Sequence, residues 1–389
     1  MDITIHPGKL HGSVTAIPSK SQAHRLLICA AFADSQTTLL CPETNRDIEA
    51  TADCLRSLGA DIIRSDTGYT VTPIRNIPRT AMLNCCESGS TLRFMLPIVG
   101  ALGVDATIAM EGRLPQRPLS PLWEEMERMG CALSRPTENS IRCTGKLRPG
   151  DYTIDGSVSS QFITGLLFAL SLIDGQTDLQ ITGKVESRPY IDMTRQAMAL
   201  FDAPRYHSPG TVTVEGDWSN GAFWLAAQAV GSPLSVKGLD PKSAQGDRAA
   251  VEIFSQLERG MPTISAADIP DLVPILAVTA AAKNGAVFTD IRRLRLKESD
   301  RVESVITMLK NLGANAYATE NTLTVHGGGL TGGIVDSVND HRIAMAAAIA
   351  ATACAAPVTV LGAEAVSKSY PGFWHEYARL GGHYEQHLR

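Results

Sequence analysis

The stretch Arg295-Leu296-Lys297-Glu298-Ser299-Asp300-Arg301 decides how the rest of this chain is interpreted. An apolar series follows it, and its helical spacing predicts an amphipathic helix over residues 302–312. Asp300 precedes Glu303 by three residues, a capping-box pattern, so we expect the helix to begin at about Asp300. Lys297 and Arg301 then lie at a helix N-terminus, where positive charge is unfavourable unless an anion is bound. The alternative for this stretch alone is a solvated charged loop.

A recurring pattern surrounds this stretch: a helix ends at a glycine or similar break, and a strand, a turn and a second strand follow. Strands that alternate with helices predict α/β architecture. The copies lie roughly 50 to 70 residues apart, longer than solenoid repeats, so we expect two compact domains with three copies each. The six copies begin near Cys54, Met126, Met198, Ile253 (weakly), Met308 and Tyr377, and we expect the third to finish with a strand over residues 211–214.

Composition excludes several classes of protein. The 389 residues suffice for two domains, and 44% hydrophobic and 19% charged residues are ordinary for a soluble globular protein. A net charge of −5 argues against a general nucleic-acid binder, although a basic cleft remains compatible with it. We see no signal peptide and no apolar run long enough to span a bilayer, so we expect no membrane partner.

The cysteines and histidines do not indicate a metal site. The eight cysteines are scattered without a Cys-x-x-Cys pair, so we expect reduced, mostly buried thiols in a cytoplasmic protein. His383 and His387 have metal-ligand spacing, but a frayed chain end explains them better than zinc.

Other expected helix starts also carry serine, glycine and cations. Each one alone is an ordinary cap, as we expect for Asp217. If related units point these helix starts into one cleft, they form a large anion site. The chain has no Walker motif and no Gly-x-Gly-x-x-Gly, so a P-loop or Rossmann site is excluded. The helix starts in question are 18–25, 87–93, 114–119, 156–161, 187–190, 340–342 and 367–370.

Two acids stand among these cations, Asp271 and Glu298. Carboxylates held near several cations and a substrate are candidates for general acid–base catalysis. The alternative for Asp271 is a simple N-cap of the apolar helix expected over 275–282.

Five motifs together resemble one family, the 3-phosphoshikimate 1-carboxyvinyltransferases (EPSP synthases) of the enolpyruvyl transferases. The resemblance extends from Pro18 to Pro371. It implies an inside-out α/β barrel of two similar domains, each with three βαβαββ repeats, and an active site in the interdomain cleft. It also implies that 14–215 bind shikimate phosphate, and that 1–13 with 216–389 complete the phosphoenolpyruvate site. The motifs are Pro18-Ser19-Lys20-Ser21, Leu114-Pro115-Gln116-Arg117-Pro118-Leu119, Ser159-Ser160-Gln161, Arg295–Arg301 and Asp340-His341-Arg342.

The resemblance also implies a reaction. The enolpyruvyl group of phosphoenolpyruvate passes to the 5-hydroxyl of shikimate 3-phosphate by addition and elimination, phosphate is released, and a monomer acts without cofactor or metal. Asp271 accepts the hydroxyl proton, Glu298 handles the methylene proton, and Lys20 is the third catalytic residue. The residues implied for shikimate 3-phosphate are Lys20, Ser21, Arg25, Ser159, Ser160, Gln161, Ser187, Tyr190, Asp271 and Lys297. Those implied for phosphoenolpyruvate are Lys20, Gly89, Arg117, Gln161, Arg301, Arg342 and Lys368.

The chain departs from the family pattern at Glu87, Ser90 and Arg46. Glu87 is expected to add negative charge near the phosphoenolpyruvate pocket, and Arg46 removes one of two acids common after the first helix. The nearest alternative is the UDP-N-acetylglucosamine enolpyruvyl transferase, which typically carries a reactive cysteine in the loop that matches 111–118; this chain has none there. A silent anion-binding relative and a protein-binding repeat scaffold are weaker alternatives.

Overall fold

The computed structural model describes residues 1–387, which form two compact units. Unit 1 comprises Met1–Ile17 and the chain from Glu215 onward, and unit 2 comprises Pro18–Val214. The family resemblance predicts that the chain crosses between the domains after residues 13 and 215. Strand β2 (Gly12–Thr15) explains the difference at the first crossing, because it pairs in parallel with β13 (Leu234–Lys237) of unit 1.

Both units are built from one module, a βαβα segment that a β-hairpin closes. In each complete module the first and second strands are parallel neighbours, and the hairpin adds two antiparallel strands. The complete middle module of unit 2 is β6 (Thr80–Asn84), α3 (Gly89–Leu102), β7 (Asp105–Ala109), α4 (Leu122–Arg128), β8 (Cys131–Thr137) and β9 (Ser140–Gly145), with sheet order β6-β7-β9-β8.

The other complete modules follow the same order, and two of them use a strand from a distant part of the chain. In unit 2, β12 (Thr211–Thr213) supplies the first strand of the module that continues with α1 (Lys20–Ala31), β3 (Thr37–Leu40), α2 (Arg46–Ser57), β4 (Asp61–Ser65) and β5 (Gly68–Thr72). In unit 1, one module is β14 (Thr263–Ser265), α9 (Val273–Ala282), β15 (Gly285–Thr289), α10 (Arg301–Asn311), β16 (Ala316–Ala318) and β17 (Thr322–His326). The other is β18 (Gly333–Asp336), α11 (His341–Ala351), β19 (Val358–Leu361), α12 (Phe373–Arg379) and β20 (Tyr384–His387), and β1 (Asp2–Ile5) closes it.

The third module of each unit is shorter. In residues 1–387 it has a two-stranded parallel sheet and no closing hairpin. The strand 211–213, expected to finish the third copy of the repeat, instead pairs with β3 of the first module. The short modules are β10 (Gly150–Asp155), α5 (Ser160–Leu170), β11 (Thr177–Thr182) and α6 (Arg188–Leu200) in unit 2, and β2, α7 (Trp218–Ala229), β13 and α8 (Ala250–Arg259) in unit 1.

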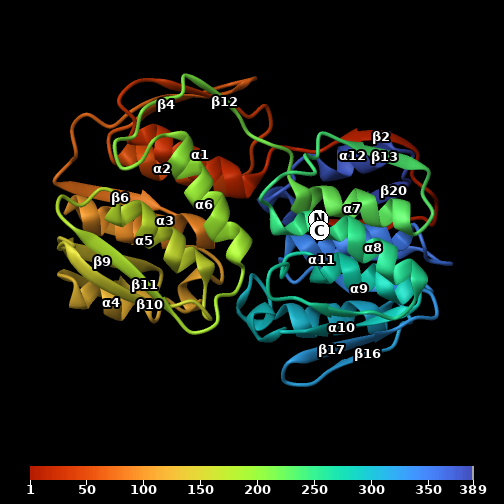
Figure 1. Ribbon diagram of the computed structural model, residues 1–389. Coiled ribbons are helices and arrows are strands. Elements are labelled where there is room, and N and C mark those ends of the chain that lie inside the picture. Colours follow the sequence, from red (N-terminus) through yellow and green to blue (C-terminus); the bar gives the residue numbers. More distant parts are fainter. Residues whose placement is uncertain (388–389) are drawn as a thin grey trace. The chain divides into compact units, whose positions relative to one another are not determined.

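Helices pack in the centre of each unit and the sheets lie outside them (Figure 1). Helices α9 and α11 contact each other and are buried nearly all round, as expected for central helices. In unit 2, α3 packs on α5. Gly165 makes this approach possible, because a Cβ there would overlap the carbonyl oxygen of Arg93. Each unit therefore has its own apolar core around its helices.

The predicted helix starts were accurate to within a few residues. The side chain of Asp300 accepts hydrogen bonds from the backbone N–H groups of Val302 and Glu303, and Asp217 caps α7 in the same way. Helices α3 and α6 begin earlier than the sequence predicts, at Gly89 rather than Phe94 and at Arg188 rather than Asp192. Within residues 1–387, no helix is long and apolar enough to cross a membrane.

Candidate active site

The charged stretch that precedes α10 forms a dense cluster of ions in unit 1. The guanidinium of Arg301 is 1% exposed and lies among three carboxylates. Its Nη1 is 2.6 Å from Asp271 Oδ1, its Nη2 is 2.7 Å from Glu298 Oε2, and its Nε is 2.9 Å from Asp340 Oδ2. We call Asp271, Lys297, Glu298, Arg301, Asp340 and Arg342 the Arg301 cluster.

Asp271 is the point where the cations of this cluster converge. Besides Arg301, Lys297 Nζ lies 3.3 Å from its Oδ1, and Arg342 Nη2 lies 3.5 Å from its Oδ2. Asp271 is not a helix cap, because α9 begins at Val273 and its N-cap position is Leu272. The simple structural alternative for Asp271 is therefore wrong, and this carboxylate is held among three cations.

Charge and burial act in opposite directions on these groups. Burial alone would raise the pKa of Asp271, but Lys297, Arg342 and Arg301 together hold it well below its usual value. Burial lowers the pKa of Lys297 to about 8, even though Asp271 opposes that change. The cluster thus contains an ionised carboxylate beside an unusually acidic ammonium group.

Asp340 is the most deeply buried carboxylate of the cluster. Its carboxylate is fully buried, accepts a hydrogen bond from the hydroxyl of Ser299 at 3.0 Å, and caps α11 through the backbone N–H of Arg342. Lys368 joins the same region from the 3-10 turn Ala363–Lys368, where its Nζ donates to the carbonyl oxygen of Asn339 at 2.7 Å.

Sequence reasoning missed Asp247, a buried carboxylate that the turn Gly246–Ala249 holds near this cluster. The hydroxyl of Ser219 donates to its Oδ2, and its Oδ1 has no hydrogen-bond partner within residues 1–387. Burial first, and then the charge of Asp271, raise the pKa of Asp247 to about 7. The only signal in the sequence was an acid in a polar loop, which is too common to interpret.

In unit 2, the start of α3 forms a cradle that we call the Gly89 cradle: Gly89, Ser90, Arg93, Arg117 and Gln161. A Cβ on Gly89 would lie 2.5 Å from Arg117 Nη1 and 2.6 Å from Arg93 Nη1, so both guanidinium groups lie against the glycine. Gln161 joins the two sides, because its Nε2 donates to Ser90 at 2.9 Å and its Oε1 accepts from Arg93 at 3.2 Å. Arg93 was not among the predicted residues; it is a buried cation inside an apolar helix start.

Arg25 organises a second group of predicted residues in unit 2. Its buried guanidinium donates to the carbonyl oxygens of Ser21 at 2.5 Å and Tyr190 at 2.8 Å, and to the hydroxyl of Thr194 at 2.9 Å. Burial lowers the pKa of Arg25 to about 10. Helices α1 and α6 are thereby joined by one cation.

The remaining predicted residues lie at helix starts of unit 2. Lys20, the first residue of α1, forms an ion pair of 2.8 Å with Asp47. Ser159 caps α5 and Ser160 is its first residue. Ser187 has a left-handed backbone with φ of 56°, which is uncommon for a non-glycine residue, and its side chain does not cap α6.

Of the three departures from the family pattern, Ser90 belongs to the Gly89 cradle itself, and the other two are Glu87 and Arg46. The carboxylate of Glu87 lies directly over Gly112, where a Cβ would overlap it. Arg46 forms a loose ion pair of 3.7 Å with Glu111, which also accepts a hydrogen bond from Asn84. Glu87 and Arg46 therefore both contact the loop that leads to Arg117, Glu87 at Gly112 and Arg46 at Glu111.

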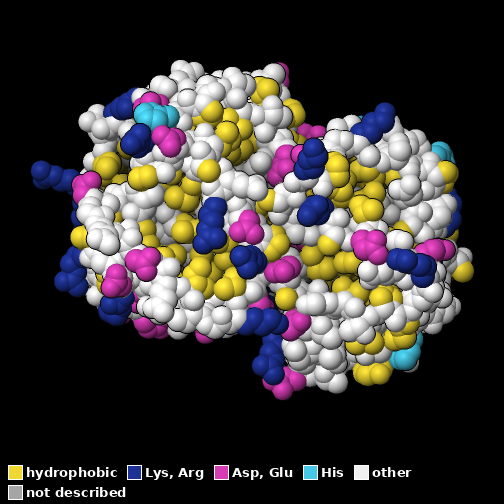
Figure 2. Space-filling view, in the orientation of Figure 1, with side chains coloured by type: hydrophobic (Ala, Val, Ile, Leu, Met, Phe, Trp, Pro, Cys, Tyr) yellow, Lys and Arg dark blue, Asp and Glu magenta, His cyan; other side chains and the backbone are white. Residues whose placement is uncertain are grey.

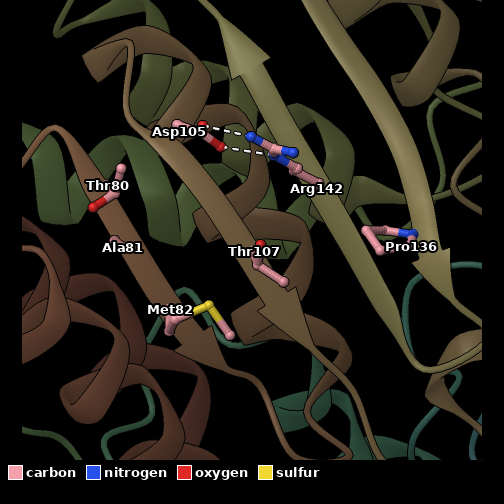
Figure 3. Close-up of a pocket in the computed structure, with 7 residues that line it drawn as sticks. All are labelled: Thr80, Ala81, Met82, Asp105, Thr107, Pro136 and Arg142. Atoms are coloured by element: carbon pink, nitrogen blue, oxygen red, sulfur yellow. Dashed lines mark hydrogen bonds and ion pairs between the residues drawn. The ribbon is translucent and has the colours of Figure 1, made fainter.

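A shallow pocket on the outer face of the β6-β7-β9-β8 sheet lies apart from these groups (Figure 3). Asp105 and Arg142 meet across it in a two-point ion pair of 2.8 and 3.0 Å. None of the predicted site residues lines this pocket. Charged groups of both signs are also scattered between apolar patches on the face shown in Figure 2.

A six-module α/β scaffold with cation–carboxylate clusters at its helix starts is typical of enzymes that act on small anionic substrates. The sequence profile described as EPSP synthase (3-phosphoshikimate 1-carboxyvinyltransferase) matches residues 5–263 and 258–377. The chain belongs to this family. It is 37% identical to the 3-phosphoshikimate 1-carboxyvinyltransferase of Clostridium kluyveri, with 99% of this chain and 98% of the relative covered. It is 36% identical to that of Clostridium botulinum, with 98% of each chain covered.

Solved structures agree on the fold. An EPSP synthase from Acinetobacter baumannii superposes with a TM-score of 0.80 at 21% sequence identity, over 100% of both chains. The family, the fold class and the enzyme class predicted from the sequence are therefore confirmed. Residue roles inside the clusters stay predictions.

Proposed function

We propose that this chain transfers the enolpyruvyl group of phosphoenolpyruvate to the 5-hydroxyl of shikimate 3-phosphate, and that the clusters described above bind the substrates and move the protons. The observation that supports this most directly is the Arg301 cluster. It holds two carboxylates, Asp271 and Glu298, ready to exchange protons beside cations suited to an anionic substrate.

Phosphoenolpyruvate carries a phosphate and a carboxylate, so its site needs several cations and exposed N–H groups. The start of α3 suits this need, since Gly89 has no side chain to separate the guanidinium groups of Arg117 and Arg93 from the N-terminal end of the helix. Arginine suits both groups because its planar fork donates two parallel hydrogen bonds. We assign phosphoenolpyruvate to Lys20, Gly89, Arg117, Gln161, Arg301, Arg342 and Lys368.

Shikimate 3-phosphate needs a phosphate site and donors to its ring and carboxylate. Serine hydroxyls at helix starts provide the former, because they add donors to the free N–H groups there. Arg25 provides a buried, fixed cation for the ring side. We assign shikimate 3-phosphate to Lys20, Ser21, Arg25, Ser159, Ser160, Gln161, Ser187, Tyr190, Asp271 and Lys297.

Substrate binding would change the pKa of Asp271, the proposed base. Its three cations keep it ionised but also weaken its attraction for a proton. An anionic substrate bound to Arg342 and Arg301 would cancel part of that positive charge, and the pKa of Asp271 would rise. The base would therefore become effective only when phosphoenolpyruvate is in place.

Glu298 has the complementary role in this proposal, at the methylene carbon. Its side chain is 25% exposed and its Oε2 lies 2.7 Å from Arg301 Nη2, so one oxygen is fixed. Lys20, beside Asp47, provides a cation on the phosphate side of the reaction. No cofactor or metal is needed in this scheme, since all proton transfers use side chains of the chain.

The proposal includes a monomer in a reducing, cytoplasmic setting. All eight cysteines are free and seven are buried, which supports the reducing setting. Sedimentation of the purified protein tests the monomer.

Phosphate release from phosphoenolpyruvate and shikimate 3-phosphate tests the residue roles. We expect Asp271→Asn and Glu298→Gln to lower kcat by about 100-fold or more, because each removes a proton-transfer group. Calorimetry with shikimate 3-phosphate should still detect binding to both variants. Full activity in Asp271→Asn would show that another group is the base, with Asp247 as the first candidate.

A further inference from the structure

Four buried polar side chains form a continuous line of hydrogen bonds through three helices of unit 2. The ring Nδ1 of His24 in α1 lies 2.7 Å from the hydroxyl of Thr51 in α2. The hydroxyl of Thr51 lies 2.7 Å from that of Thr91 in α3, which donates to the hydroxyl of Ser88 at 2.8 Å. We call these four residues the hydroxyl relay. Each of the four side chains is at most 1% exposed.

The direction of these hydrogen bonds follows from the supply of protons. Thr91 donates its single hydroxyl proton either to Ser88 or to the carbonyl oxygen of Asp47, so it is the acceptor in its hydrogen bond with Thr51. Thr51 has then used its own proton and must accept from Nδ1–H of His24. Nδ1 of His24 therefore carries a proton, and because burial and the charges of Lys20 and Arg25 lower the pKa of His24 well below its usual value, the ring is neutral. Its buried Nε2, which has no partner in residues 1–387, is a bare lone pair rather than an orphaned donor.

The relay ends at the proposed phosphoenolpyruvate site. Ser88 is the N-cap of α3 and also accepts from the backbone N–H of Thr91, so it sets where Gly89 and Ser90 lie. Thr91 further contacts the carbonyl oxygen of Asp47 at 3.4 Å, and the carboxylate of Asp47 holds Lys20. The starts of α1, α2 and α3 are thus connected through one buried network.

We propose that the hydroxyl relay is a positioning device that holds the start of α3 in register with Lys20 and Asp47, and so sets the affinity of the enzyme for phosphoenolpyruvate rather than for shikimate 3-phosphate. This rests on the proposed function. The relay residues do not touch the substrate in this scheme; they act through the start of α3, where Gly89 is assigned to phosphoenolpyruvate alone. The shikimate side has its own support, because Arg25 is held by Thr194 and by backbone carbonyl oxygens.

The test is the variant Thr51→Val, which keeps the side-chain shape and interrupts the relay at its centre. Thr51→Ser restores the hydroxyl. Thr279→Val is the matched control, since Thr279 is equally buried in α9 of unit 1 but donates only to the carbonyl oxygen of Ile275 in its own helix. Michaelis constants for both substrates are measured by phosphate release, and folding is checked by thermal unfolding.

We expect Thr51→Val to raise KM for phosphoenolpyruvate about tenfold, because His24 and Thr91 each lose a buried hydrogen bond and the start of α3 shifts. KM for shikimate 3-phosphate should stay within about twofold of the wild type, and Thr51→Ser should recover most of the loss. If Thr51→Val does not fold, Ser88→Ala removes the other end of the relay and should shift the same Michaelis constant.

Unchanged constants, an equal rise in both, or no recovery in Thr51→Ser would overturn the relay as a positioning device. Wild-type protein in the same assay separates a failure of the relay proposal from a failure of the proposed function. If the wild type releases no phosphate, the function fails; if it does and Thr51→Val behaves like Thr279→Val, only the relay fails.

Discussion

Replacing Arg301 by lysine should destabilise unit 1 even though the charge is kept. The guanidinium donates to Asp271, Glu298 and Asp340 from three different nitrogens. The ammonium of a lysine is a point charge on a flexible stem and does not reach all three in this geometry. The change therefore removes hydrogen bonds without removing the positive charge.

The magnitude depends on which carboxylate loses its partner. Asp271 and Glu298 are 21% and 25% exposed, so water replaces part of what they lose. Asp340 is fully buried and keeps only Ser299 and a backbone N–H. One lost hydrogen bond to a buried charge corresponds to about 2–3 kcal/mol of unfolding free energy. Asp340→Asn keeps the helix cap but removes the charge, so the double variant should cost about 1.5 kcal/mol less than the sum of the single variants.

Urea unfolding followed by tryptophan fluorescence is the assay. Trp218, Trp224 and Trp374 are buried in unit 1, so the signal reports mainly on that unit. The matched control is Arg259→Lys in the same unit, whose ion pair with Glu252 is exposed to solvent and should contribute little to stability. The reasoning is refuted if Arg301→Lys costs no more than the control, or if its cost is the same in the Asp340→Asn background.

Three further outcomes follow from the structure. Gly89→Ala places a methyl group against the guanidinium of Arg117, so KM for phosphoenolpyruvate in the phosphate-release assay should rise about tenfold; an unchanged KM would show that the guanidinium moves aside. Burial lowers the pKa of Lys297 to about 8 from its usual 10.5, so the unfolded state binds the proton more tightly and stability should rise between those pH values. The urea midpoint of Lys297→Met should lack that rise, and an identical pH profile would contradict it. Cys86 is partly exposed, and burial raises the pKa of its thiol to about 11. Native protein should therefore react slowly with iodoacetamide at about pH 7.5, whereas all eight thiols should react in urea-unfolded protein. Rapid labelling of the native protein would contradict this prediction.

Local signals predicted much of the fold. Asp300 and Asp217 cap the helices that their spacing indicated, because a cap needs only its own helix start. The repeated pattern of a helix, a strand, a turn and a second strand predicted the modules, because these elements follow one another directly in the sequence. The strand 211–213 was misplaced, since its partner β3 lies far away in the sequence and no local pattern specifies that pairing. The missing hairpins of the short modules also have no local sign.

The site was predicted in part. Charged residues next to helix starts stood out, so the Arg301 cluster and, in the Gly89 cradle, Gly89, Arg117 and Gln161 were predicted as site residues from the sequence. Asp247, Arg93 and the hydroxyl relay were not. Their importance comes from burial and from partners on other helices, as for Thr51 and Thr91, which lie 40 residues apart in the chain. The sequence around a helical threonine does not indicate such a partner.

Phosphate release with two alternative acceptors is the most direct test of the central claim. Purified protein is given phosphoenolpyruvate with either shikimate 3-phosphate or UDP-N-acetylglucosamine. The account predicts phosphate release only with shikimate 3-phosphate, in an amount equal to the enolpyruvyl product formed. Release only with the nucleotide sugar, or with neither acceptor from a folded protein that binds shikimate 3-phosphate, would contradict it.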